Sequence, residues 1–493
     1  MSDKTTEPVD GEYPQLITDS GSRILILGAG PGGLSAAYYL QKQGFKNVTV
    51  FEVLSHVGGM CHSVTEHQHP VELGASFVSP TFRHVICAAK ELDVKLTRFS
   101  GVTGFTFCEA KRTAEYKSLL TYAAGGTGWK NLCGLIQLFR RFLRERNRFR
   151  RILDQPGWAG VAAVPELCVS FAQWLRDRKL DALQRFFELP ITTFGYGALD
   201  EMPAAYGLKY MVGRNLFAAF SSILPWTAYL PPALSVRCFA NGYQRFWEQL
   251  SWGIDVRLNV AVQRVHRDDD KIAITYTLPR ERMESIVAPE EHRSEFDYLF
   301  IACPTMFSKL DGVLGFDENE RQQFKETRCF PHAVICVEVA NLKLPRPLAI
   351  HVPPSGLERP LVLWQPSPET PTLVVLVRLA SDTPTSGMEQ QLRGQTEKYI
   401  RALGGRIVDE NSWRSFNIWP HFKHASIEAF RNGLFDRWDI QQGVQRTFYV
   451  GGLFDFDHVE GTMEYSHYLV NRFFSHARSP SEGKEKQMAS AEV

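Results

Sequence analysis

Short apolar runs and a helical pattern alternate at the start of the chain and predict a parallel sheet. RILIL (23–27) is a wholly apolar run with the length of a buried strand, and LSAAYYLQKQ (34–43) follows as a helix that ends at Gly44. A second strand, NVTVF (47–51), comes next. Further apolar runs predict strands later in the chain: DYLFIACP (297–304), HAVICVEVA (332–340), TLVVLVRLA (372–380) and TFYV (447–450).

One predicted helix, 129–154, is both amphipathic and strongly basic. Its apolar residues recur at helical spacing: Leu132, Leu135, Ile136, Phe139, Phe142 and Leu143. Seven arginines between 140 and 151 accompany a single glutamate. Such a helix either presents a solvated arginine face or lies on an anionic membrane and collects lipid substrate there.

An uncharged stretch, 215–236, tests whether the chain crosses a membrane. It has the length of a bilayer span, but Pro225, Pro231 and Pro232 interrupt any helix within it. A bilayer would leave the freed backbone groups unsatisfied. We therefore predict a buried wall, or a lip that touches lipid, instead of a transmembrane span.

Composition and charge exclude several classes of protein. Lys and Arg number 55 and Asp and Glu 54, so no global field favours nucleic acid. Nine cysteines without a CxxC pair argue against a disulfide scaffold or a metal site and fit a reducing compartment. The polar N-terminus lacks the features of a signal peptide, so we expect a cytoplasmic protein, either free or peripheral to a membrane.

The first strand, turn, helix and second strand carry a nucleotide-binding pattern. The turn reads Gly28-Ala29-Gly30-Pro31-Gly32-Gly33, and the second strand ends in Glu52, 19 residues after Gly33. Gly28 permits the tight turn, Gly30 lets a pyrophosphate approach the backbone, and Gly33 lets the helix pack on the strand. Glu52 can accept both hydroxyls of an adenosine ribose, and an acid there disfavours a 2′-phosphate. The pattern predicts FAD or NAD in preference to NADP.

The residues after Glu52 resemble the flavin amine oxidase superfamily. HVGGMCHS places Gly58, Gly59 and Met60 just beyond the acidic strand end, and VELGASFVS supplies Gly74 and Ala75. In that superfamily the corresponding residues approach the phosphates and the ribityl chain of FAD. No second GxGxxG unit follows for a nicotinamide. The resemblance therefore implies FAD as the cofactor.

A matching piece, TFYVGGLFDFDHVEGTMEYSHYLVNRFF (447–474), lies near the C-terminus. The superfamily has a helix here whose N-terminus points at the flavin pyrimidine and stabilises negative charge on the reduced ring. The resemblance implies cofactor contacts from Gly451, Gly452, Glu460, Thr462 and Met463. Val262, in a strand-like segment in mid-chain, matches the position whose backbone meets adenine.

Several segments resemble, more closely, the bacterial polyunsaturated fatty acid double-bond isomerases. HVGGMCHS, TTFGYGALDEMPAAYGLKYM (192–211) and WPHF (419–422) occur in the order and spacing of that family. The resemblance covers most of 22–476 but is patchy between 100 and 185. It implies that 192–211 is a helical wall of the substrate cavity. Its candidate lining residues are Phe194, Tyr196 and Tyr206, although a core helix without ligand contact fits the same pattern.

The same resemblance implies a gate at the cavity mouth. In that family an arginine and an aromatic residue hold the fatty-acid carboxylate, and Arg98 in DVKLTRF matches the arginine. Its planar guanidinium suits bidentate contact with a carboxylate. The aromatic partner falls at Phe220 or Phe217. FSGVTGF after Arg98 departs from the family's more polar continuation.

The chemistry implied by this family needs few protein groups. Flavin N5 would take a hydride from between two double bonds and return it two carbons along, giving a conjugated diene. His421 and His467 are candidate acids or bases, although a structural role also fits each of them. Cys61 is expected to pack near the cofactor and not to act as a redox thiol. An alternative is an oxidase, desaturase or oxidative cyclase on an apolar amine or polyene. A third is a flavin-bound lipid carrier without activity.

These observations predict an α/β fold with a Rossmann-like FAD-binding domain, an amine-oxidase-type substrate domain and a helical subdomain. The expected boundaries are 22–100, 235–310 and 440–476 for a discontinuous FAD domain, 101–234 for a helical region, 311–439 for a substrate sheet, and flexible tails at 1–21 and 477–493.

Overall fold

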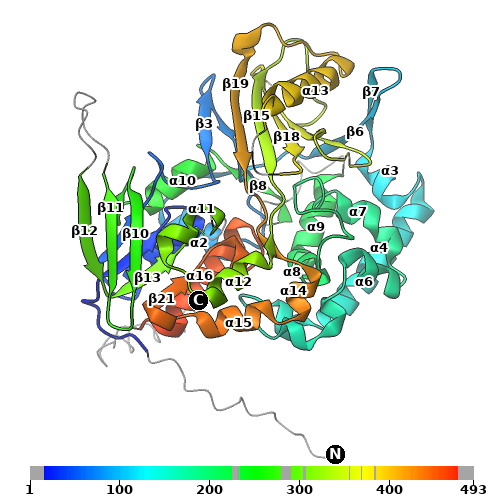
Figure 1. Ribbon diagram of the computed structural model, residues 1–493. Coiled ribbons are helices and arrows are strands. Elements are labelled where there is room, and N and C mark those ends of the chain that lie inside the picture. The colour runs from blue at the N-terminus through cyan, green and yellow to red at the C-terminus, as the bar shows by residue number, and fades with distance from the viewer. Residues whose placement is uncertain are drawn as a thin grey trace, which may run out of the picture.

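A computed structural model describes residues 16–224, 231, 234–278, 290–303, 307–354, 356–367, 369–381, 383 and 385–475 (Figure 1). A five-stranded and a seven-stranded sheet organise the chain, and the helices α3 to α9 gather on one side of them. The α/β class predicted from the sequence is confirmed.

The five-stranded sheet is parallel and draws its strands from three distant parts of the chain. Its order is β21 (Thr447–Tyr449), β13 (Tyr298–Ile301), β1 (Ile24–Leu27), β2 (Val48–Phe51) and β9 (Asp255–Arg257). In register, Leu27 lies opposite both Phe51 and Ile301. The apolar runs that predict buried strands are buried here, because helices cover the sheet.

Two helices pack together beside this sheet and shape the nucleotide end of the site. They are α1 (Pro31–Lys42) and α16 (Val459–Phe473). The helix α1 begins with Pro31 at its first position, where a missing N–H costs nothing. Also nearby are α2 (Arg83–Glu91) and α10 (Tyr243–Leu250).

The seven-stranded sheet forms the upper part of the molecule in Figure 1. Its order is β19 (Trp413–Trp419), β15 (His332–Glu338), β18 (Thr372–Arg378), β17 (Pro360–Trp364), β16 (Leu348–His351), β6 (Val102–Cys108) and β7 (Thr113–Lys117). One face packs on α13 (Met388–Ala402). The strands β6 and β7 come from the segment expected to be helical, so that region also contributes to the sheet.

The helical part of the chain comprises α3 (Leu119–Ala124), α4 (Trp129–Asn147), α5 (Arg150–Leu153), α6 (Phe171–Asp177), α7 (Gln184–Glu188), α8 (Ala204–Tyr210) and α9 (Gly213–Ser222). In α4, Leu135, Phe139 and Phe142 are buried as the pattern predicts. Arg146 is buried as well and pairs with Asp154 at 2.5 Å. The other six arginines between 140 and 151 are exposed.

Shorter elements complete the fold. They are β3 (Ser63–Glu66), β4 (His69–Glu72), β5 (Leu96–Arg98), β8 (Arg237–Phe239), β10 (Ala261–Arg267), β11 (Ile272–Thr277), β12 (Glu291–Phe296), α11 (Phe307–Leu314), α12 (Glu318–Lys325), β14 (Thr327–Arg328), β20 (His424–Ala425), α14 (Ile427–Arg431) and α15 (Leu434–Gln441). The strands β10, β11 and β12 form an antiparallel sheet at the left of Figure 1.

The ends of the described chain meet at the five-stranded sheet. Ile17 bridges Phe474, and its N–H donates to the Phe473 carbonyl at 2.8 Å. The last residues of the expected N-terminal tail are therefore held in place. Residues 1–15 and 476–493 lie outside the described residues, as do 225–230 and 232–233 of the uncharged stretch. Within the described chain, no helix combines the length and the apolar character of a membrane span.

Candidate active site

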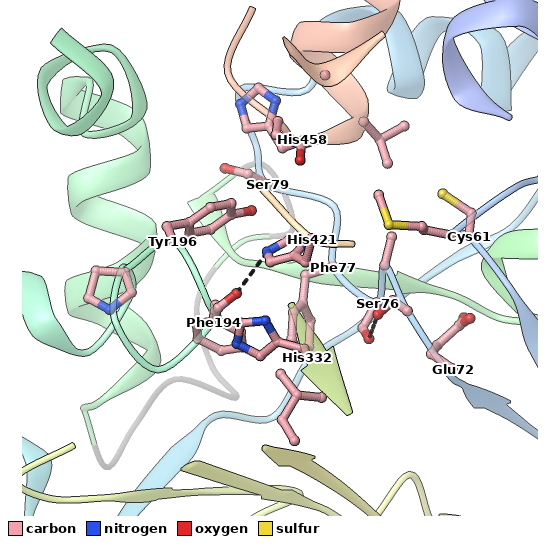
Figure 2. A pocket seen from close by; sticks show the side chains of 18 of the residues that line it. Cys61, Glu72, Ser76, Phe77, Ser79, Phe194, Tyr196, His332, His421 and His458 are labelled. Atoms are coloured by element: carbon pink, nitrogen blue, oxygen red, sulfur yellow. Dashed lines mark hydrogen bonds between the residues drawn. The ribbon is translucent and has the colours of Figure 1, made fainter. Parts of the chain in front are cut away.

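One cavity of about 440 Å³ connects the glycine-rich turns of the parallel sheet with the seven-stranded sheet. Gly28, Gly30 and Glu52 line one end of it. Apolar side chains line the other. Figure 2 shows Tyr196, His421 and His332 on one side of this cavity and Cys61 and Glu72 on the opposite side.

The turn between β1 and α1 has the geometry that its glycines require. Gly28 has a φ of +103°, which side chains disfavour. A Cβ on Gly33 would lie 1.9 Å from the Gly28 carbonyl oxygen, so only glycine lets α1 begin this close to the strand. A Cβ on Gly30 would instead project beside Gly59, with the Gly59 Cα as its nearest neighbour at 3.7 Å. The space above Gly30 therefore suits a ligand backbone such as a pyrophosphate.

Glu52 closes this end of the cavity. Its carboxylate accepts hydrogen bonds from the Ala29 N–H at 2.7 Å and the Leu54 N–H at 2.9 Å. The side chain is buried, yet it lines the cavity and keeps lone pairs for ribose hydroxyls. The predicted adenine contact, Val262, lies in β10 outside the cavity lining, although the neighbouring Val260 N–H donates to the Glu52 carbonyl at 2.8 Å.

The second glycine loop approaches the first closely. A Cβ on Gly59 would lie 3.1 Å from the Gly30 Cα, and one on Gly74 would lie 1.7 Å from the Met60 carbonyl oxygen. Gly59, Met60, Gly74 and Ala75 line the cavity. Ala29, Gly33 and Gly58 do not, and they act by shaping the turns. Pro31, like Gly30, belongs to the lining. These residues form a cradle that fits the phosphates and ribityl chain of FAD.

The N-terminus of α16 faces the same end of the cavity. Gly451, Gly452 and Thr462 line it, and the His458 Nδ1 caps the helix by accepting from the Gly461 N–H at 2.8 Å. Two predicted cofactor residues lie elsewhere. Met463 is fully buried outside the lining.

Glu460 is the second of these residues, and it holds α2 in place. Its carboxylate accepts from the backbone N–H groups of His84 at 2.9 Å and Val85 at 3.1 Å. These N–H groups belong to the first turn of α2, where they need an acceptor, and an acid is favoured at that helix end. Glu460 lies outside the cavity lining.

The apolar end of the cavity is built largely from one face of the seven-stranded sheet. Alternate residues of four strands point into it: Val334, Leu348, Ile350, Val362, Val374 and Leu376. Their sequence neighbours, such as Ile335, Leu363 and Val375, pack against α13 on the other face. Sequence reasoning missed this wall because both faces are apolar, which removes the usual polar alternation.

The segment 192–211 is a wall of the cavity, but most of it is not helical. Residues 192–203 form turns, and only α8 is a helix. Gly195 and Gly197 have φ of +91° and +90°, which excludes a regular helix there. Phe194 and Tyr196 line the cavity as predicted. Tyr206 is fully buried outside the lining, and its hydroxyl accepts from the Ala425 N–H at 2.9 Å.

The residues predicted to form the gate of the cavity do not line it. They are Arg98, Phe217 and Phe220. Arg98 is exposed at the end of β5, and its neighbour Phe99 lines the cavity. Phe217 is 43% exposed, while Phe220 packs with Phe139 at a ring distance of 5.5 Å. Within α9, the lining residues are Asn215, Ala218, Ala219 and Ser222.

Two histidines on the cavity are held in the neutral form. Burial lowers the pKa of His421 to about 4 and that of His332, which also faces His421, to about 3. His421 donates from Nε2 to the Phe194 carbonyl at 3.1 Å (Figure 2). His332 donates from Nδ1 to the Phe330 carbonyl at 2.9 Å. A neutral imidazole with a committed N–H is a poor proton donor to a substrate.

The other sulfur and histidine candidates do not supply acid–base chemistry. His467 lies outside the lining and contacts Asn471 at 2.8 Å. Cys61 lines the cavity, but burial raises the pKa of its thiol well above the ordinary range. All nine cysteines are free thiols.

Several titratable residues of the cavity were not anticipated, among them Glu72, His332 and Asp457. Asp457, two residues before α16, lines the cavity, and burial raises the pKa of its carboxyl group to about 6. Its Oδ2 accepts from the Lys423 N–H at 3.2 Å. The DFD sequence that contains it carries no recognisable motif, so only the fold brings it to the cavity.

The chain matches the family described as flavin containing amine oxidoreductase over residues 31–348. It belongs to that family. FAD is accordingly its cofactor, and the family's chemistry is that of FAD-dependent oxidoreductases and isomerases. The geometry of the glycine turns and Glu52 fits that assignment.

Individual relatives are distant. The polyenoic fatty acid isomerase of Ptilota filicina is 24% identical over 284 residues, which are 52% of this chain and 52% of that protein. The chain thus spans about half the length of this curated relative. A conjugated-linoleic-acid-producing fatty acid isomerase from P. acnes has a similar fold, with a TM-score of 0.75, 22% identity, and coverage of 92% of this chain and 99% of that one. Putrescine oxidase bound to putrescine gives a TM-score of 0.58 at 17% identity, covering 92% and 98%.

Proposed function

We propose that the protein is a FAD-dependent isomerase that moves a double bond in an unsaturated, fatty-acid-like substrate and yields a conjugated product. One observation carries the proposal: a single cavity joins the cradle for FAD to a long apolar wall. Val334, Ile350 and Val374 of that wall suit an alkyl chain better than a polar metabolite. The similarity to fatty acid isomerases supports the same substrate class.

The residues of the chain would act mainly by positioning. Bound FAD supplies a group that can accept a hydride from the substrate and give it back. The sheet wall and Phe194 would hold the alkyl chain against that group and exclude water from it. The lowered pKa values of His421 and His332 make both imidazoles weak bases, so they would not readily take a proton from the chain after it has lost a hydride. Arg98, whose neighbour Phe99 lines the cavity, would hold the carboxylate.

In a second candidate function, the substrate loses a hydride to FAD and does not regain it. This is an oxidase, desaturase or oxidative cyclase acting on an apolar amine or polyene. The Asp457 carboxyl group favours it, because an acid on the cavity has the right charge to pair with an ammonium group. A flavin-bound lipid carrier is the third candidate, and it would bind ligand without any product.

Incubation with linoleic and α-linolenic acids distinguishes the three. Absorbance of a conjugated diene and release of hydrogen peroxide are followed together, in air and without oxygen. The isomerase gives diene without peroxide under both conditions. Peroxide in air, or flavin that bleaches and stays bleached without oxygen, assigns the second candidate. If FAD and fatty acid are bound but neither diene nor peroxide appears, the result supports the lipid carrier.

We also propose that α4 lies on the surface of an anionic membrane, which would make the protein a peripheral membrane protein. Arg140, Arg141 and Arg144 are exposed on this helix, and Trp129 at its start is 76% exposed. Arginines beside an exposed tryptophan suit the interface of a bilayer. Such contact would let the enzyme take an apolar substrate directly from lipid.

A further inference from the structure

The carboxyl group of Asp457 is fixed beside the glycine turn that ends β21. Its Oδ1 lies 1.8 Å from the position that a Cβ on Gly452 would take, so the carboxyl group fills the space of a side chain at that position. Its Oδ2 accepts from the Lys423 N–H. Asp457 and Gly452 both line the cavity, together with Thr462 of α16. The carboxyl group is therefore held at the flavin end of the cavity by two separate segments.

Asp457 differs in its charge balance from the nearby Asp455. Asp455 pairs with Lys209 at 2.9 Å and accepts from the Gly157 N–H at 2.8 Å. Among the described residues, Asp457 forms no ion pair, and its acceptor contacts are backbone N–H groups. Its negative charge is thus not cancelled within the protein. Because this charge lies within the protein, it is screened less than it would be in water.

A fixed negative charge opposes a second negative charge nearby. Flavin that has taken up two electrons is anionic near neutral pH, whereas oxidised flavin is neutral. The N-terminus of α16 favours the anionic form, since the helix dipole places partial positive charge there. Asp457 lies two residues before that terminus and acts with the opposite sign. The two groups together set the electron affinity of bound FAD.

We propose that Asp457 is a redox-tuning residue whose carboxylate lowers the midpoint potential of the bound FAD. The effect on potential depends only on FAD. Its consequence rests on the proposed function: a weaker hold on electrons favours their return to the substrate, as an isomerase requires. Asp457 would then favour the return of the hydride to the substrate.

The test is the midpoint potential of bound FAD in the holoenzyme, measured at pH 7.5 without oxygen against a reference dye. Asp457→Asn should favour the reduced flavin about tenfold, a rise of about 30 mV for a two-electron couple. Asp200→Asn removes one exposed charge from the same chain and should leave the potential unchanged. An unchanged or lowered potential in Asp457→Asn overturns the proposal.

A second variant and a second measurement keep the proposal testable if Asp457→Asn does not fold correctly. Asp457→Ser removes the charge with a smaller side chain and should move the potential in the same direction. Sulfite, which adds to electron-poor flavins, should bind both variants about tenfold more tightly than it binds the wild type. Wild-type sulfite affinity in both variants, with full FAD content, contradicts the proposal. Substrate is absent from every measurement, so failure of the isomerase assay would leave this result intact.

Discussion

Gly195 lies directly against the imidazole of His332: a Cβ on this glycine would come within 2.4 Å of the His332 Cε1. The contact joins the turns of 192–203 to β15 of the seven-stranded sheet. It fixes the wall of the cavity on which Phe194 and Tyr196 lie. The glycine in FGYG is thus a requirement of packing as well as of backbone conformation.

We expect Gly195→Ala to destabilise the protein by about 2–4 kcal/mol, since it combines a positive φ with overpacking against His332. Urea unfolding monitored by tryptophan fluorescence measures the change. Gly134→Ala is the matched control. It lies in α4 with open space around the added methyl group and should be neutral or stabilise by up to about 1 kcal/mol. Equal effects of the two substitutions would contradict the role given to Gly195.

Glu52→Gln should weaken FAD binding by about 10- to 100-fold. An amide cannot replace both carboxylate oxygens, which accept from Ala29 and Leu54, and it loses the charge that strengthens bonds to ribose hydroxyls. Flavin fluorescence on reconstitution of the apoprotein gives the dissociation constant. Glu91→Gln, which disrupts an exposed ion pair with Lys42, should change it less than twofold. Unaltered affinity in Glu52→Gln would remove Glu52 from the ribose site.

Arg98→Ala should raise the KM for a free fatty acid at least tenfold and leave the KM for its methyl ester nearly unchanged. The ester carries no charge for the guanidinium to bind. Initial rates of diene formation with the two substrates provide the measurement. Arg401→Ala is the control, because Arg401 lies on α13, across the sheet from the cavity. A loss of equal size for acid and ester would show that Arg98 does not hold the carboxylate.

His424 should make the protein less stable in mild acid. Burial lowers the pKa of His424 to about 4, whereas an unfolded histidine titrates near pH ~6.5. Its neutral form stabilises the fold above that pH, and this stability is lost as the pH falls from about 6.5 towards 4. Between pH 7.5 and 5.5 the expected loss from this residue is about 1.4 kcal/mol.

The comparison of wild type with His424→Asn isolates this contribution. Urea unfolding at the two pH values should show a smaller acid loss in the variant, by about 1 kcal/mol. Burial raises the pKa of Glu72 to about 7 and that of Asp457 to about 6, which acts in the opposite sense. Both carboxyl groups are present in both proteins, so their effect cancels. An identical acid loss in the two proteins would refute the assignment.

Replacing Arg140, Arg141 and Arg144 together by Glu should abolish binding to vesicles that contain phosphatidylserine. Each basic residue near an anionic surface contributes about 1 kcal/mol, so the triple change should lower the partition coefficient at least 100-fold. Cosedimentation measures it, with phosphatidylcholine vesicles as the lipid control. The same three changes at Arg257, Arg321 and Arg401 alter the net charge equally and test whether net charge, and not the position on α4, determines vesicle binding. If the wild-type protein does not sediment with anionic vesicles, the proposed membrane contact is wrong.

The sequence was most informative where backbone geometry dictates residue type. Gly28 and Gly33 could be assigned to a nucleotide turn because few other residues fit a positive φ or a helix packed on a carbonyl oxygen. Glu52 could be assigned for a similar reason, since its place at the end of a strand fixes where its carboxylate lies. These constraints are local, and a local pattern reveals them.

Side chains whose role depends on distant packing could not be predicted in this way. Tyr206 was expected on the cavity, but α8 turns it towards Ala425, which lies more than 200 residues later. Met463 and Glu460 fit the expected helix terminus, yet they face the core and α2. Asp457 reaches the cavity only because the segment at Lys423 and the Gly452 turn hold it there. Such placements are set by tertiary contacts.

The strand order of the parallel sheet also has a consequence for biogenesis. Ile24 pairs with Tyr298, and Leu299 pairs with Thr447, so this sheet closes loops of well over a hundred residues. Contacts of such high sequence separation form late and slowly. The cradle for FAD is therefore complete only after β21 has left the ribosome, and the edge of β13 that pairs with β21 must stay unpaired until then. Cofactor capture is a late step in the life of this protein, and FAD supply in the cell will govern how much of the newly made chain survives.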